Sequence, residues 1–197
     1  IRYMTTHERM CVMPKYSFTS KRSDYLTPAW FYEKVLDEAG LTMFDCDVCC
    51  SMFNIPAHFR YRQDGLYLNS RNRISENDGL KGTWFPVNWC NPPFKIADKF
   101  VYKALAEQKK GHTTYMLLPV RTETDYWYNG IYKEGKPRHN IDVMFLKKGL
   151  CFVDPETGKY VQMRKKMPNG KYKTVDGVFK EGLALVVIKG NKECLDA

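Results

Sequence analysis

Val87-Asn88-Trp89-Cys90-Asn91-Pro92-Pro93-Phe94 is the stretch that decides the fold class of this chain. Its first four residues predict a short strand, and the residues after it predict a helix that ends at Gly111. The apolar residues of that helix recur at helical spacing: Ile96, Ala97, Phe100, Val101, Ala104 and Leu105. A strand-loop-helix junction is where open α/β sheets place their ligand sites. The loop at 91–94 is therefore a candidate site.

The loop tetrapeptide resembles the Asn/Asp-Pro-Pro-aromatic motif with which amino-methyltransferases hold a planar NH2 group. Such an amine is a poor nucleophile because its lone pair is delocalised into the ring. The Asn91 side-chain oxygen and the Pro92 carbonyl could accept its hydrogens and free the lone pair, while Pro93 stiffens the backbone. Phe94 offers a flat surface for stacking a base. We interpret these four residues as catalytic; the alternative is a Pro-Pro turn that only ends a strand.

Length, charge and cysteine content narrow the class of protein. The 197 residues fit one domain, and 31 Lys and Arg against 22 Asp and Glu give a net charge of +9. This excess favours a polyanion such as nucleic acid, although ordinary basic proteins share it. No apolar run is long enough to cross a bilayer, and no signal-peptide pattern occurs. Cys46, Cys49 and Cys50 lack a second Cys/His pair at ligand spacing, so free thiols and no metal are expected.

Local patterns divide the chain into segments. Thr27 as N-cap, Pro28 at the first helical position and Gly40 after the last turn predict the first helix. Residues 54–83 carry little periodicity. Apolar runs predict strands at 41–50, 112–120, 141–146, 150–153 and 183–188. We expect an irregular arm at 1–24, one domain at 25–190 and a tail at 191–197.

Residues 154–180 predict a basic hairpin. Met167-Pro168-Asn169-Gly170 is a plausible hairpin turn, and no acidic residue interrupts 159–173. Basic side chains interleaved with tyrosines suit phosphate contact, while a solvated surface hairpin is the plain alternative. The candidate DNA-binding residues here are Arg164, Lys165, Lys166 and Lys171.

Together these landmarks resemble the phage-type DNA N6-adenine methyltransferases, a Dam-like family. The matching stretches occur in the family's order: Leu26-Thr27-Pro28, 44–50, Asn77-Asp78-Gly79-Leu80 with Trp84, 90–94 and 117–122. The resemblance covers roughly residues 25–153 and resumes at the last strand.

The resemblance implies an α/β, Rossmann-like fold dependent on S-adenosylmethionine. Its sheet would be mostly parallel, with helices on both faces, an antiparallel late strand and the basic hairpin as an insertion. The cofactor would lie at the carboxyl ends of the strands, with Asp47 facing its cationic end or its ribose. The cofactor-binding residues implied are Thr27, Pro28, Asp45, Asp47, Asp78 and Leu80. Thr27 and Asp78 also have plain interpretations, as a helix cap and a turn residue.

The implied activity is methyl transfer to N6 of an adenine flipped out of double-stranded DNA, in the cytoplasm of a bacterial host if the chain is phage-encoded. Arg121 and Thr122 would contact DNA; alternatively Arg121 pins the Asn91 loop or forms a surface salt bridge. The same loop would serve methylation of cytosine N4, an RNA base or a protein glutamine. No glycine-rich loop follows the first strand, which leaves open a non-catalytic DNA-binding protein on a decayed scaffold.

Overall fold

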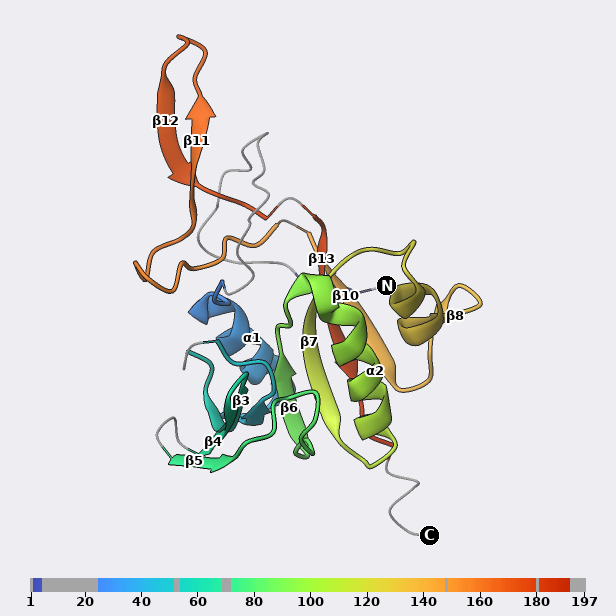
Figure 1. The fold of residues 1–197 in the computed structure, drawn as a ribbon. Coiled ribbons are helices and arrows are strands. Elements are labelled where there is room, and N and C mark those ends of the chain that lie inside the picture. Colours follow the sequence, from blue (N-terminus) through green and yellow to red (C-terminus); the bar gives the residue numbers. More distant parts are fainter. Residues whose placement is uncertain are drawn as a thin grey trace.

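A nine-stranded sheet forms the centre of the protein, as seen in a computed structural model (Figure 1). The structure describes residues 2–4, 25–51, 54–68, 72–147, 149–179 and 181–191. The strand order is β1-β10-β13-β7-β6-β2-β3-β4-β5. These strands are β1 (Arg2–Met4), β2 (Phe44–Asp47), β3 (Ala57–Arg62), β4 (Gly65–Leu68), β5 (Asn72–Ser75), β6 (Val87–Cys90), β7 (Thr113–Pro119), β10 (Ile141–Leu146) and β13 (Leu183–Ile188).

The sheet is mixed, with a parallel centre. β3, β2, β6 and β7 are parallel to one another, whereas β4 and β5 continue one side as an antiparallel meander. β13 lies between β7 and β10 and is antiparallel to both, so the antiparallel late strand is confirmed. All six of its residues are buried because their side chains alternate between the two covered faces of the sheet. The expectation of a mostly parallel sheet holds only for the centre, since edge additions on both sides introduce antiparallel pairs.

Helices cover both faces of the sheet, as expected. α1 (Ala29–Ala39) buries Phe31, Val35 and Leu36 against one face, and α2 (Ala97–Gln108) packs on the other. Successive strand residues point to opposite faces, so Trp89 meets α1's cluster whereas Cys90 meets α2's. Two shorter helical segments complete the α2 side: the 3-10 turn η1 (Phe94–Ile96) and the π-helix η2 (Tyr126–Ile131).

The ends of α1 differ from the sequence prediction at one terminus. Pro28, not Thr27, is the N-cap, and no side chain caps the helix; the Phe31 N–H donates to the Pro28 carbonyl at 3.0 Å. Thr27 was wrongly predicted as the cap, and its hydroxyl is used elsewhere. Gly40 ends the helix with φ 66°, a left-handed conformation that glycine adopts without strain.

Three other segments differ from the prediction. Residues 54–83 contain β3 to β5, although no strand was expected there. Residues 150–153 were predicted to be a strand, but only Val153 forms isolated bridges, to Leu26 and Tyr160. Residues 2–4 belong to the sheet rather than to an arm, because β1 pairs in parallel with β10. The rest of the predicted arm, 5–24, and residues 192–197 of the predicted tail lie outside the described residues.

The basic hairpin is present and stands away from the sheet, on the side where α1 and α2 begin (Figure 1). β11 (Gln162–Lys166) pairs antiparallel with β12 (Tyr172–Asp176), and the Met167 N–H donates to the Lys171 carbonyl at 2.7 Å. A second small hairpin joins β8 (Tyr132–Lys133) to β9 (Lys136–Pro137). None of the helices within the described ranges has the length and apolar character needed to span a membrane.

Candidate active site

A cavity of about 670 Å³ lies at the carboxyl ends of β2 and β6. Parallel strands end at the same edge of a sheet, so residues that follow β2 and β6 meet there. The cavity brings together six of the predicted site residues: Thr27, Asp47, Asp78, Leu80, Asn91 and Pro93. Its volume lies within the range of small-molecule and cofactor sites. Residues 64 positions apart in the chain, Thr27 and Asn91, are in direct contact in it.

Asn91 directly follows β6 and lines the cavity. Its Nδ2 donates to the Thr27 hydroxyl oxygen at 3.2 Å. The Pro93 carbonyl accepts the Ile96 N–H at 2.9 Å, which opens the η1 turn. No donor among the described residues reaches the Pro92 carbonyl. The Asn91 amide oxygen, on a residue that lines the cavity, likewise has no donor among the described residues.

Phe94 lies beside the cavity rather than in its lining. Its ring makes edge contacts with Phe179, at 5.1 Å between centroids, and with Phe152, at 6.3 Å. Pro92 is buried and also absent from the lining. Aromatic packing thus fixes the end of the tetrapeptide that enters α2.

Arg121 ties this loop to the ends of two strands. Its Nε and Nη2 donate to the two carboxylate oxygens of Glu181 at 2.6 and 2.9 Å, and its Nη1 donates to the Phe94 carbonyl at 3.1 Å. The hydrogen bonds that Arg121 donates to Glu181, together with the charge of Glu181, raise the pKa of Arg121 against the lowering effect of burial. All three contacts are internal, which supports the alternative in which Arg121 pins the Asn91 loop; contact of Arg121 with DNA stays a prediction. Thr122 is exposed and makes none of them.

We expect Arg121→Gln to lower kcat for methyl transfer by about tenfold or more, because loss of the pin lets the loop shift from its working geometry. DNA affinity and its salt dependence should stay unchanged in a fluorescence anisotropy titration. Glu181→Gln should act in the same direction. Asp142→Asn, which breaks the exposed ion pair with Lys189, is the matched control. Weaker DNA binding by Arg121→Gln would instead restore the phosphate role.

Asp47 is the buried carboxylate of the cavity. It is 3% exposed, and its Oδ1 accepts the Cys49 N–H at 3.2 Å. Burial raises the pKa of Asp47 to about 7, against the lowering effects of the Cys49 hydrogen bond and the Arg60 charge. A carboxylate poised in this way can accept hydrogen bonds from hydroxyl, amine or ammonium groups.

Because the pKa of Asp47 is raised on folding, we expect its contribution to the free energy of unfolding to fall as pH rises from about 3.8 to about 7. Its pKa is raised from 3.8 to about 7 on folding, so between these values the folded state binds more protons than the unfolded state. Asp47→Asn removes this dependence, and its advantage in unfolding free energy over wild type should grow by up to about 1.4 kcal/mol per pH unit in that window. Urea unfolding at pH 5 and pH 7 measures it. An equal difference at both pH values would contradict the assignment.

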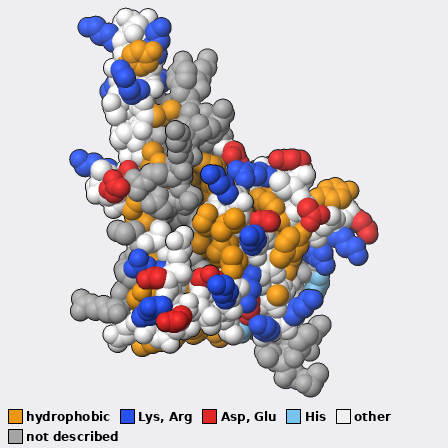
Figure 2. All heavy atoms as spheres, viewed as in Figure 1, with side chains coloured by type: hydrophobic (Ala, Val, Ile, Leu, Met, Phe, Trp, Pro, Cys, Tyr) orange, Lys and Arg blue, Asp and Glu red, His pale blue; other side chains and the backbone are white. Residues whose placement is uncertain are grey.

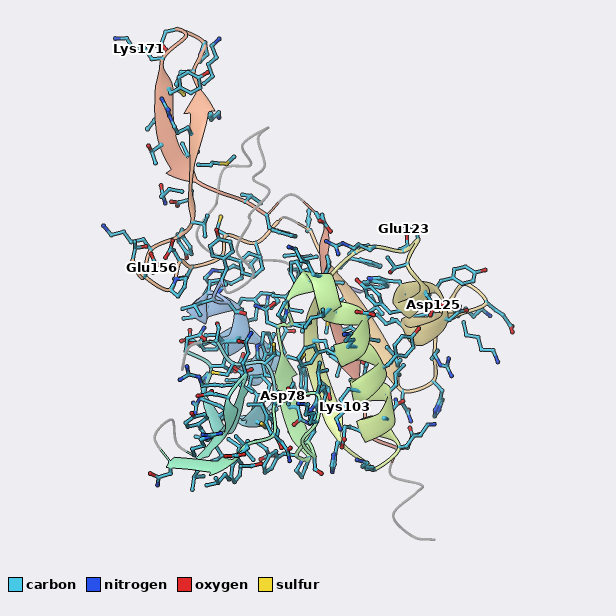
Figure 3. The ribbon with its side chains drawn as sticks, in the orientation of Figure 1. Asp78, Lys103, Glu123, Asp125, Glu156 and Lys171 are labelled. Carbon is cyan, nitrogen blue, oxygen red and sulfur yellow. The ribbon has the colours of Figure 1, made fainter. Side chains whose placement is uncertain are left out.

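Asp78 is a turn residue that also lines the cavity, so its role toward the cofactor stays a prediction. Its Oδ1 accepts the Leu80 and Lys81 N–H groups at 2.9 and 3.0 Å, as a turn residue does, and it also lines the cavity. Figure 3 labels Asp78 at the level of the strands, below the hairpin. Gly79 permits the close approach of this turn, since a Cβ there would lie 2.0 Å from the Val48 carbonyl oxygen.

Two predicted cofactor ligands lie elsewhere. The Asp45 Oδ2 accepts the Val87 N–H at 2.9 Å. Asp45 precedes Asp47 by two residues in β2, so its side chain reaches the start of β6, away from the carboxyl edge. Pro28 is the cap of α1 and does not line the cavity. Both residues therefore have structural roles in this fold, and cofactor binding by either of them stays a prediction.

One side of the cavity, formed by residues in and next to β3, was not predicted from the sequence. Asn54, Tyr61, Arg62 and Asp64 line it. The Tyr61 hydroxyl donates to the Thr83 carbonyl at 2.8 Å, and Asp64 accepts the Tyr67 hydroxyl at 2.7 Å. Asp64-Gly65 was the available signal, because Asp-Gly is a strong hairpin-turn dipeptide. Within the described ranges no three His, Cys, Asp or Glu side chains gather as a metal site, and the five described cysteines are free.

The predicted basic residues of the hairpin lie outside the cavity. Arg164 stacks over the exposed Tyr172 ring at 4.8 Å, and Lys165 pairs across the hairpin with Lys173. Lys/Arg side chains gather at the outer end of the hairpin in Figure 2, and Figure 3 labels Lys171 at its tip. This clustering of positive charge is typical of a surface that contacts phosphate.

A model of the DNA N-6-adenine-methyltransferase (Dam) family matches residues 17–189. The chain belongs to this family. The Dam match includes every strand from β2 to β13 and all the residues that line the cavity. It confirms the resemblance drawn from the ordered motifs, and it supports a DNA adenine N6-methyltransferase in general terms. No curated protein and no solved structure matched the chain.

Proposed function

We propose that the protein transfers the methyl group of S-adenosylmethionine to N6 of an adenine flipped out of double-stranded DNA. One observation carries the proposal: in a Dam-family chain, Asn91 of the Asn-Pro-Pro-Phe loop shares a cavity with Thr27, Asp47, Asp78 and Leu80. The loop that would hold the methyl-accepting amine and a cavity of cofactor size are thereby contiguous.

The cavity suits S-adenosylmethionine in size and in the chemistry of its lining. Bound there, the cofactor would supply an activated methyl group. Asp47 would accept hydrogen bonds from its ribose or its amino group, Asp78 from its adenine, and Leu80 would contact its apolar parts. The strand order supports the proposal too, because the parallel centre and the inserted antiparallel β13 agree with a Rossmann-like methyltransferase sheet.

The loop residues would act by alignment. The Asn91 amide oxygen and the Pro92 carbonyl would accept the two hydrogens of the adenine amine and turn its lone pair toward the methyl group. Extraction of the base from the duplex costs a few kcal/mol. Stacking on an aromatic ring is worth about 1–3 kcal/mol, and Phe94 would supply that ring.

DNA contact through the hairpin is part of the proposal. Each phosphate contact contributes about 0.9 to the slope of log affinity against log salt. Lys166→Ala should therefore reduce that slope by about one, and alanine at Arg164, Lys165, Lys166 and Lys171 together should reduce it by about three to four. Lys109→Ala, an exposed lysine just after α2, is the control. Equal slopes for Lys166→Ala and Lys109→Ala would remove the hairpin from the DNA interface.

The test of the proposed function is transfer of labelled methyl from S-adenosylmethionine to unmethylated DNA, followed by nucleoside mass spectrometry. The expected product is N6-methyladenine. N4-methylcytosine would redirect the proposal to the other planar amine of DNA. Cofactor binding in calorimetry without any DNA product would point to RNA or protein, and no binding heat would indicate a decayed scaffold.

A further inference from the structure

Thr27 has a hydroxyl that its own helix does not use. Pro28 caps α1 without any side-chain hydrogen bond, and Thr27 is only 3% exposed. Its hydroxyl oxygen instead accepts the Nδ2 hydrogen of Asn91 at 3.2 Å. The contact joins the segment before α1 to the loop after β6, and both residues line the cavity.

The Thr27 end of this contact is held from three directions. Asn54 Nδ2 donates to the Thr27 carbonyl at 3.1 Å. Leu26 exchanges two backbone hydrogen bonds with Val153, both at 2.9 Å. Pro28 restricts its own backbone, and its φ is −65°. The backbone that carries the hydroxyl is therefore held in place, and the hydroxyl is presented to the Asn91 amide from one position.

We propose that Thr27 is a positioning residue that sets the orientation of the Asn91 amide. This inference rests on the proposed function. An amide has a donor end and an acceptor end, and a half-turn about its last bond exchanges them. With the NH2 end held by Thr27, the oxygen end remains for the substrate. The reverse orientation would set the Asn91 NH2 against the substrate NH2, donor against donor, and the amine would lose its acceptor.

Thr27→Val keeps the branched shape of the buried side chain and removes its hydroxyl, and with it the oxygen that accepts the Asn91 Nδ2 hydrogen. We expect kcat to fall by about tenfold. The dissociation constants of DNA and S-adenosylmethionine should remain near their wild-type values, and Thr27→Ser should restore most of kcat. Thr113→Val is the matched control, because Thr113 loses a comparable hydroxyl contact, with the Gly190 N–H at 3.1 Å, at the start of β7.

A second readout does not require activity. The two side-chain amide protons of Asn91, identified in NMR spectra by their loss in Asn91→Ala, should be protected from exchange in wild type and exposed in Thr27→Val. The inference is overturned if those signals do not change, if Thr27→Val matches Thr113→Val in kcat, or if cofactor affinity falls as much as kcat. A wild-type protein that methylates no DNA would refute the proposed function, while the amide signals would still decide the Thr27 contact.

Discussion

Asn91→Ala is expected to lower kcat for DNA methylation by on the order of 10²–10³-fold, the usual effect of removing one hydrogen-bonding group that acts on the reacting atoms. Alanine takes away the acceptor that draws on the amine hydrogens, and it leaves the β6 strand and the cavity lining otherwise in place. Nucleoside mass spectrometry of N6-methyladenine, with saturating cofactor, measures the loss.

Asn129→Ala provides the comparison for this prediction. Asn129 is an exposed asparagine in η2 that bonds Asp125 at 2.6 Å, so its removal costs a similar contact outside the cavity. Its kcat should remain near wild type. If Asn91→Ala keeps most of the activity while binding cofactor and DNA normally, the loop is a structural turn and the chemistry lies elsewhere.

Glu107→Ala is expected to lower the free energy of unfolding by about 3 kcal/mol, because it removes one member of a buried charge cluster. The Glu107 side chain is 0% exposed and contacts Lys103, Lys110 and His112, each at 2.9 Å. Burial alone would raise the pKa of Glu107, but the hydrogen bonds from both lysines and the Lys103 charge outweigh it, and the pKa is lowered. Lys103 and His112 are mostly buried and would lose their counter-charge.

Urea unfolding measures the Glu107 effect. Glu38→Ala is the reference, since Glu38 forms an exposed i,i+4 pair with Lys34 at 3.6 Å and should cost less than about 0.5 kcal/mol. A loss for Glu107→Ala no larger than for Glu38→Ala would mean that the cluster contributes little. Cofactor affinity should stay unchanged in folded Glu107→Ala, because the cluster lies at the far end of α2 from the cavity.

The sequence predicted those parts of the fold whose cause is local. β13 is a continuous apolar run, β7 ends in one, and both main helices show apolar faces. β5 was not predicted because three of its four residues are exposed. Its hydrogen bonds to β4, rather than an apolar pattern, define it as a strand. Residues 150–153 were wrongly predicted to be a strand. Leu150 and Phe152 are buried because they pack with α1's cluster on one face of the sheet, although they do not form a strand.

The candidate site was predictable where order in the chain carried the information. Thr27, Asp47, Asp78 and Asn91 were placed by ordered motifs, and the structure brings them together. DNA contact was predicted for Arg121 from its positive charge. The sequence alone does not show which acidic residue pairs with that charge in the fold. That partner, Glu181, is 60 residues away and becomes visible only when β7 and β13 pair.

The position of β13 has a consequence for biosynthesis. Its neighbours β7 and β10 are both synthesised earlier, but in the sheet they are connected only by β13, residues 183–188, which pairs with each of them. Until those residues leave the ribosome, the nascent chain carries two unjoined sets of strands with uncovered edges, and Glu181 has not reached Arg121. The contacts that hold the Asn91 loop through Arg121 and Glu181 are thus completed late in synthesis.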